Sequence, residues 1–168
     1  MINCPNIKTL LAAFILPVAA GMPLVAAPLD QISHLEGLNG LHFNVLTTSF
    51  QDTDLELRRD LSDIVELELR RAKVPVFEFF SNEPAGNVPL VEVVLDVQRG
   101  ARNSFTLRLE LRDTVVIERN NIRITATTYA TERSGTTPNA DALGSEIKNT
   151  MRTMMAEFTD AYREVNPL

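Results

Sequence analysis

The chain has 168 residues, 45% of them hydrophobic, and a formal net charge of −6 at pH 7. This acidic balance disfavours nucleic acid as a partner, because phosphate backbones bind basic surfaces. The single cysteine, Cys4, allows no disulfide within the chain, and its place ahead of an apolar run disfavours lipid attachment.

The N-terminal segment has the pattern of a secretory signal. Lys8 is the only charged residue before Asp30, and residues 10–20 are almost wholly apolar. That run is shorter than the roughly 20 residues that a membrane-spanning helix needs, so we expect no transmembrane anchor. The pattern therefore predicts an exported protein, either periplasmic or extracellular.

Small residues after the apolar run offer a cleavage position at Ala27, but Pro28 would hinder cleavage there, so Ala26 and Ala20 are alternatives. We predict a cleaved signal peptide over residues 1–27 and one mature domain over residues 28–168. Removing Lys8 leaves 15 basic and 22 acidic residues, and so a mature net charge of −7.

The first half of the mature chain alternates between strand and helix patterns. Residues 41–46 alternate as a strand, and an apolar stripe at helical spacing predicts a helix over residues 55–73, which Pro75 ends. Thr53 and Glu56 stand at capping-box spacing before it. Residues 74–80 then predict a short strand.

Three further strands are predicted, at residues 91–97, 105–117 and 122–133, followed by a turn at residues 134–138. Between the last two strands, Asn120-Asn121 suits a two-residue hairpin turn. Such a turn fixes the register and predicts these residue pairs across the two strands: Arg119 with Ile122, Ile117 with Ile124, Val115 with Ala126, Leu111 with Ala130, Arg112 with Tyr129, and Arg108 with Arg133.

The last element carries the strongest helix pattern, over residues 141–165, with apolar side chains at three- and four-residue steps. Its methionines are expected to fill the core. The whole pattern predicts an α+β fold in the order β-α-β-β-β-β-α. In it, two helices pack on one face of a mainly antiparallel sheet of four to five strands, and the other face meets water.

Two segments of the chain resemble those of a known group of proteins. They are the run Val65-Glu66-Leu67-Glu68-Leu69-Arg70-Arg71-Ala72-Lys73-Val74-Pro75-Val76 and, near the C-terminus, Asn166-Pro167. They look like a group of small uncharacterised exported bacterial proteins with an "ELRLRKAGI" helix end. Lys73 stands where that pattern has glycine. The element order also resembles envelope assembly modules such as the lipopolysaccharide-assembly lipoprotein. That is a likeness of fold, and fold does not carry function with it.

Residues able to do chemistry are few. His34 and His42 lack the spacing of zinc ligands, and the chain has neither a nucleophile elbow nor a phosphate loop. Glu68 could be a buried acid, but pairing with Arg71 is the expected arrangement. We therefore expect no catalytic residues, no metal and no cofactor.

One cluster suggests binding. The predicted register gathers Arg108, Arg112, Tyr129 and Arg133 on the water-facing side of the hairpin, and the loop at residues 99–103 adds Arg99 and Arg102. These six residues could bind an acidic ligand or another envelope protein, with Tyr129 stacked on Arg112. The alternative is an ordinary solvated face on which Glu92 and Asp96 neutralise Arg108.

The function expected from these observations is a non-enzymatic interaction or assembly module of the bacterial envelope. The alternative is a small-ligand-binding protein, or an enzyme accessory subunit, with a pocket between the helices and the sheet.

Overall fold

The computed structural model describes residues 32–48, 51–77 and 88–167, so the predicted signal peptide lies outside the described residues. In chain order the elements are η1 (Ser33–Leu35), β1 (His42–Thr47), α2 (Asp52–Arg71), β2 (Leu90–Gln98), β3 (Asn103–Ile117), β4 (Ile122–Thr137) and α3 (Ala140–Val165).

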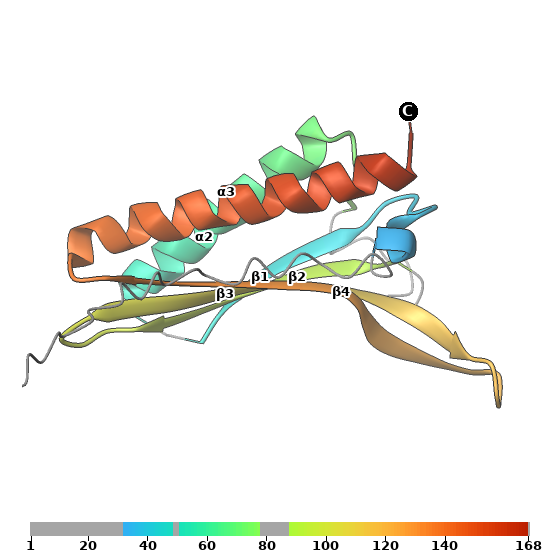
Figure 1. Cartoon of the computed structure of the whole chain (residues 1–168), viewed down its shortest axis with the longest axis horizontal. Helices are drawn as coiled ribbons and strands as arrows, with labels where there is room; N and C mark the ends of the chain where they lie inside the picture. The colour runs from blue at the N-terminus through green and yellow to red at the C-terminus, as the bar shows by residue number, and fades with distance from the viewer. Residues whose placement is uncertain (1–31, 49–50, 78–87, 168) are drawn as a thin grey trace, which may run out of the picture.

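The four strands form one sheet in the order β1-β2-β3-β4. β1 pairs with β2 in parallel, as expected where a helix links two neighbouring strands, and the other two pairings are antiparallel. Figure 1 shows α2 and α3 together on one face of this sheet. The predicted α+β class, with two helices on one face, is confirmed.

The strand predicted directly after the first helix is reduced, in the described residues, to one parallel bridge between Leu41 and Val76. Leu41 N donates to Pro75 O at 3.0 Å, and Phe77 N donates to Leu41 O at 3.0 Å. Residues 78–80 of the prediction lie outside the described residues. The bridge lines the side of β1 opposite β2.

Helix α2 buries the predicted apolar stripe, including Leu57, Leu61 and Val65. The capping box is wrong, because the helix begins at Asp52 and its N-cap, Gln51, makes no side-chain capping hydrogen bond. The expected pairing of Glu68 is confirmed by an ion pair of 2.9 Å with Arg71.

The C-terminal end of α2 closes through a left-handed residue. Lys73 has φ 59°, a conformation that glycine adopts most readily. Lys73 N donates to Arg70 O and Val74 N donates to Leu69 O, both at 3.0 Å, which is the hydrogen-bond pattern of a Schellman motif. The glycine of the resembling pattern falls at the position where this backbone needs φ above zero.

Helix α3 buries its predicted stripe against the sheet, and its methionines do fill the core. Its buried side chains are Leu143, Ile147, Met151, Met154, Met155, Phe158, Thr159 and Tyr162. Asn139 caps the helix by accepting a hydrogen bond from Asp141 N at 2.9 Å.

Asn166, just past α3, fastens the N-terminal part of the described chain. Its Oδ1 accepts from Gly37 N at 2.8 Å, and its Nδ2 donates to Leu35 O at 2.7 Å. Tyr162 adds a bond from its hydroxyl to Leu38 O at 3.3 Å. The Asn-Pro ending therefore has a structural role that local sequence patterns do not reveal.

The predicted hairpin register is wrong in two places. Ile117 pairs with Ile122, so the turn spans four residues, and a β-bulge lies near Leu111 and Arg112. Leu111 pairs with Tyr129 and Arg112 with Thr127, which leaves Thr128 as the extra residue. A bulge moves the following side chains to opposite faces relative to an unbroken strand, so the faces predicted for the β4 residues after it are also wrong.

The turn predicted at residues 134–138 is wrong as well, since β4 continues to Thr137. Gly135, which lies within the predicted turn, is opposite Phe105. A Cβ on this glycine would lie 2.5 Å from Phe105 Cε1. The glycine makes room for an aromatic ring, and its presence does not bend the strand.

Candidate interaction surfaces

The six residues predicted to form a binding cluster are separated by the structure. Arg108 and Arg112 lie on the open face of the sheet, whereas Tyr129 and Arg133 pair with buried Leu111 and Leu107 and so lie on the helix side. The predicted pairing of Arg108 with Arg133 and the stacking of Tyr129 on Arg112 are therefore wrong.

The two remaining residues of that cluster lie at the far end of β2. Arg99 and Arg102 are exposed residues of the turn between β2 and β3, as expected for a loop there. Arg99 is held by a carboxylate of α2. A shared binding role for all six residues stays a prediction, and the structure supplies no single surface that holds them.

The arginines on the open face act as counterions to carboxylates on their own strand and on neighbouring strands. Glu92 and Glu110 lie directly opposite one another in the β2–β3 ladder, an arrangement that like charges make unfavourable. Arg112 lies 3.3 Å from Glu92, and Arg108 lies 3.4 Å from Glu110 and 3.3 Å from Glu132. This agrees with a solvated, neutralised face, although Arg108 uses Glu110 and Glu132 instead of Glu92 and Asp96.

Arg133 reaches α3 and not the open face. Its Nη2 donates to Glu157 Oε1 at 2.7 Å, and the two side chains are 29% and 44% exposed. This ion pair ties the outer strand to the helix above it.

Replacing Arg133 with glutamate should destabilise the free protein, because the new carboxylate would face Glu157. Replacing Arg108 with glutamate should do the same beside Glu110 and Glu132. Both groups are partly exposed, so we expect about 0.5–1 kcal/mol each. Urea melts at low salt would measure the losses, and a stabilisation by Arg133→Glu would contradict the observed pairing.

Tyr129 is part of the core. It is 3% exposed, and its ring meets that of Phe158 edge to face with centroids 5.4 Å apart. Burial raises the pKa of the Tyr129 phenol, the Glu157 charge raises it further, and Arg133 opposes the rise. The Tyr129 phenol therefore stays protonated to a higher pH in the folded protein than in the unfolded chain.

This shift gives a stability change with a defined sign. Above about pH 10 the unfolded tyrosine loses its proton while the folded one keeps it, so stability falls as pH rises from there toward the folded pKa. Tyr129→Phe removes this contribution. Urea melts at pH 8 to 11 should show a smaller alkaline loss for Tyr129→Phe than for the parent protein, and identical losses would contradict the burial of the phenol.

A cleft of about 390 Å³ opens between the N-terminal ends of α2 and α3. Asp54 of α2 is fully buried and pairs with Arg99 of the β2–β3 turn, whose Nη1 donates to Asp54 Oδ2 at 2.8 Å. This contact raises the pKa of the Arg99 guanidinium, so Arg99 stays charged. The ion pair fixes the start of α2 to the sheet end.

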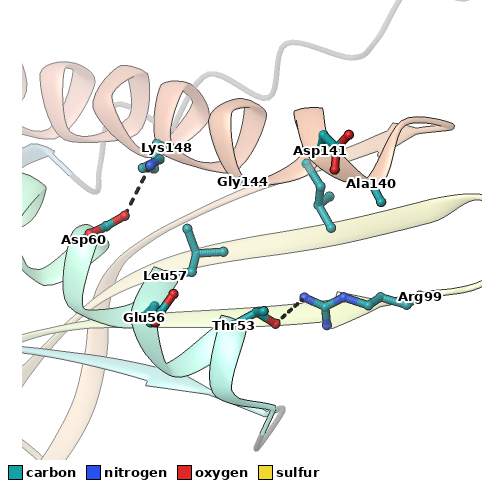
Figure 2. A pocket seen from close by; sticks show the side chains of 10 residues that line it. Thr53, Glu56, Leu57, Asp60, Arg99, Ala140, Asp141, Gly144 and Lys148 are labelled. Atoms are coloured by element: carbon teal, nitrogen blue, oxygen red, sulfur yellow. Dashed lines mark hydrogen bonds and ion pairs between the residues drawn. The ribbon is translucent and has the colours of Figure 1, made fainter.

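Figure 2 shows the other polar side chains that line the cleft. Lys148 of α3 lies 3.2 Å from Asp60 of α2 and bridges the two helices across it. Glu56 and Asp141 are further exposed carboxylates of the lining. In the part of the chain that the structure describes, no three histidine, cysteine or carboxylate side chains gather as a metal site.

The far end of the β3–β4 hairpin forms a separate surface. β2 pairs with β3 only as far as Arg112, so residues 113–126, here named the hairpin extension, form a two-stranded ribbon beyond the four-stranded sheet. Figure 1 shows it projecting past the C-terminal end of α3 and bending away from both helices. Neither helix covers it.

The hairpin extension exposes apolar side chains. Val116, Ile122 and Ile124 are 48%, 52% and 42% exposed, which makes them three of the most exposed large hydrophobic residues described. Val115 pairs with Ile124 and Ile117 with Ile122 on one face of the ribbon, which also holds Asp113 opposite Ala126. Val116 lies on the other face, opposite Arg123. Its four charged residues cancel to a net charge of zero in a chain of net charge −6; they are Asp113, Glu118, Arg119 and Arg123.

The alternation of residues 113–126 predicts the strands of this extension, but not its exposure. The difference in strand length could have predicted this exposure. β3 and β4 have 15 and 16 residues whereas β2 has 9, so the hairpin has to extend beyond β2.

No protein-family model and no curated protein matches this sequence. Solved structures that are similar to the chain include the following two. A minor lipoprotein from Acinetobacter baumannii is 15% identical with a TM-score of 0.31, over 73% of this chain and 91% of that one. A hypothetical protein from Chlamydia trachomatis is 15% identical with a TM-score of 0.37, over 75% and 93%. The fold described above rests on strand pairing and packing, and not on these similarities.

Neither of the long helices in the described ranges has an apolar stretch of the length needed to cross a bilayer.

Proposed function

We propose that this protein is an exported, non-enzymatic interaction or assembly module of the bacterial cell envelope, located in the periplasm or outside the cell. The observation that supports this function is the hairpin extension, with its exposed Val116, Ile122 and Ile124.

Two physical reasons make this surface suited to binding. A two-stranded ribbon is at best marginally stable in water, and apolar side chains that stay exposed on it do not stabilise the free protein. Clustered exposed apolar side chains are typical of interaction sites. Beyond Arg112, the β2–β3 ladder ends, so strand β2 does not shield this part of the hairpin. A partner protein would cover the exposed apolar side chains.

Site-specific photo-crosslinking in cells tests this function. A crosslinkable residue in place of Ile124 should capture a defined set of envelope proteins, and one in place of exposed Arg59 on α2 is the matched control. Adducts at position 124 that Ile122→Asp abolishes would support the proposal. Equal adducts at both positions, or none at 124, would contradict it.

The cleft favours a second candidate function, that of a small-ligand-binding protein or an enzyme accessory subunit. It lies between the helices and combines Arg99 and Lys148 with three exposed carboxylates. Thermal-shift measurements with metabolites and acidic ligands would test this candidate. A shift that Lys148→Glu removes would favour it over the interaction module.

Export is the part of the proposal that the N-terminal sequence supports. Expressed in a Gram-negative host, the protein should leave the cytoplasm and begin between Gly21 and Leu29, because Lys8 and the apolar residues 10–20 form a signal pattern. Fractionation and N-terminal sequencing measure both outcomes. Cytoplasmic protein that keeps Met1 would refute export.

A further inference from the structure

Asn39 and Gly40 form an Asn-Gly pair in the loop between η1 and β1. Asparagine in such a pair is chemically unstable, because the next backbone nitrogen can attack its side-chain amide and glycine has no side chain to hinder the attack. A folded structure opposes this reaction when it buries the asparagine or holds the attacking nitrogen in a hydrogen bond. The surroundings of each asparagine therefore decide its fate.

The surroundings of Asn39 leave the reaction open. Asn39 is exposed, and within the described ranges no hydrogen bond holds its side chain or the Gly40 backbone nitrogen. Gly40 is mostly covered, but both residues line a hollow of about 480 Å³. Water can therefore reach the pair to take up the Gly40 proton and to complete the reaction.

The fold requires the glycine of this pair. Gly40 has φ 152°, and a Cβ at this position would overlap Cε2 of the Phe77 ring. A side chain that could shield the Asn39 amide would therefore collide with Phe77. The close contact that positions this loop also keeps the reactive pair in the chain.

The exposed asparagines of the β3–β4 turn are protected by comparison. Asn121 N, the nitrogen that would attack Asn120, donates to Ile117 O at 2.8 Å. Ile122 N, the nitrogen that would attack Asn121, donates to Asn120 Oδ1 at 3.2 Å. The other described asparagines are not followed by glycine; they are Asn44, Asn103, Asn139, Asn149 and Asn166.

We propose that Asn39 is a site of spontaneous deamidation, with water as the only co-reactant. Gly40 N loses its proton and attacks Asn39 Cγ, and the new C–N bond closes a succinimide ring while the side-chain nitrogen takes up a proton and leaves as ammonia. Water then adds to either carbonyl carbon and opens the ring, which leaves aspartate or isoaspartate at position 39. This inference goes beyond the proposed function, because the pair lies outside the hairpin extension.

Isoaspartate would lengthen the backbone between two anchored residues. Leu38 O accepts from the Tyr162 hydroxyl at 3.3 Å, and Leu41 N donates to Pro75 O at 3.0 Å. An inserted methylene must disturb at least one of these bonds, and the new carboxylate would share the hollow with Glu36. The modified protein should therefore unfold at a lower temperature than the unmodified protein.

Ageing of the folded protein at pH 8, followed by peptide mass spectrometry, tests the site. Asn39 should deamidate at least roughly tenfold faster than Asn120, the matched exposed control, because an unbonded nitrogen without a side chain lowers the barrier. The rate at Asn39 should rise with pH, since Gly40 N must lose its proton. An intact Asn39, or equal rates at the two positions, would overturn the proposal.

Two variants separate the inserted methylene from the added charge. Asn39→Gln must close a larger ring, so it should stay unmodified and keep its melting temperature on ageing. Asn39→Asp has the charge on a backbone of normal length. In circular dichroism melts the aged parent protein should unfold below both variants. Aged protein that contains isoaspartate but melts with Asn39→Gln would overturn the predicted effect of the modification.

Discussion

Replacement of Leu61 by aspartate is expected to lower the free energy of unfolding by about 3 kcal/mol or more. Leu61 is fully buried at the centre of the α2 stripe, where a carboxylate would have no counterion in the apolar core. A domain of this size has a stability of roughly 5–15 kcal/mol, so the loss is a large share of the total.

Arg59, two residues away on the same helix, provides the control. It is exposed, and Arg59→Asp should change the stability by no more than about 0.5 kcal/mol. Urea denaturation followed by circular dichroism measures both variants. Equal melting of Leu61→Asp and the parent protein would show that α2 does not pack as described.

Replacement of Phe158 by alanine is expected to cost about 3–5 kcal/mol. Phe158 is fully buried on α3, and its ring packs edge to face against Tyr129 of β4. The truncation removes this aromatic contact and leaves a cavity between the helix and the outer half of the sheet.

Two variants show whether the effect comes from the cavity. Phe158→Leu keeps most of the volume and should cost only about 1 kcal/mol, and Arg152→Ala on the exposed side of α3 should cost about 0.5 kcal/mol or less. The measurement is again urea denaturation at neutral pH. Losses that are equal for Phe158→Ala and Phe158→Leu would contradict the packing of this ring.

The amino-acid sequence by itself determined the two long helices, the four strands of the sheet and the order of these elements. Alternation along residues 105–117 and the stripe over residues 141–165 are local patterns, and local patterns reflect which side of each element is buried. The core side chains Leu61, Met151 and Phe158 follow from the same patterns, and the structure buries all three.

Only the tertiary structure decided the register of the hairpin and the place of each candidate site residue. A four-residue turn and a bulge at Thr128 each shift the pairing without a distinct local signal, and one residue of shift moves Tyr129 and Arg133 to the helix side. The contacts of Asp54 with Arg99 and of Asn166 with Gly37 join residues far apart in the chain. Such contacts depend on how whole elements pack, and the sequence alone carries no periodic pattern that records them.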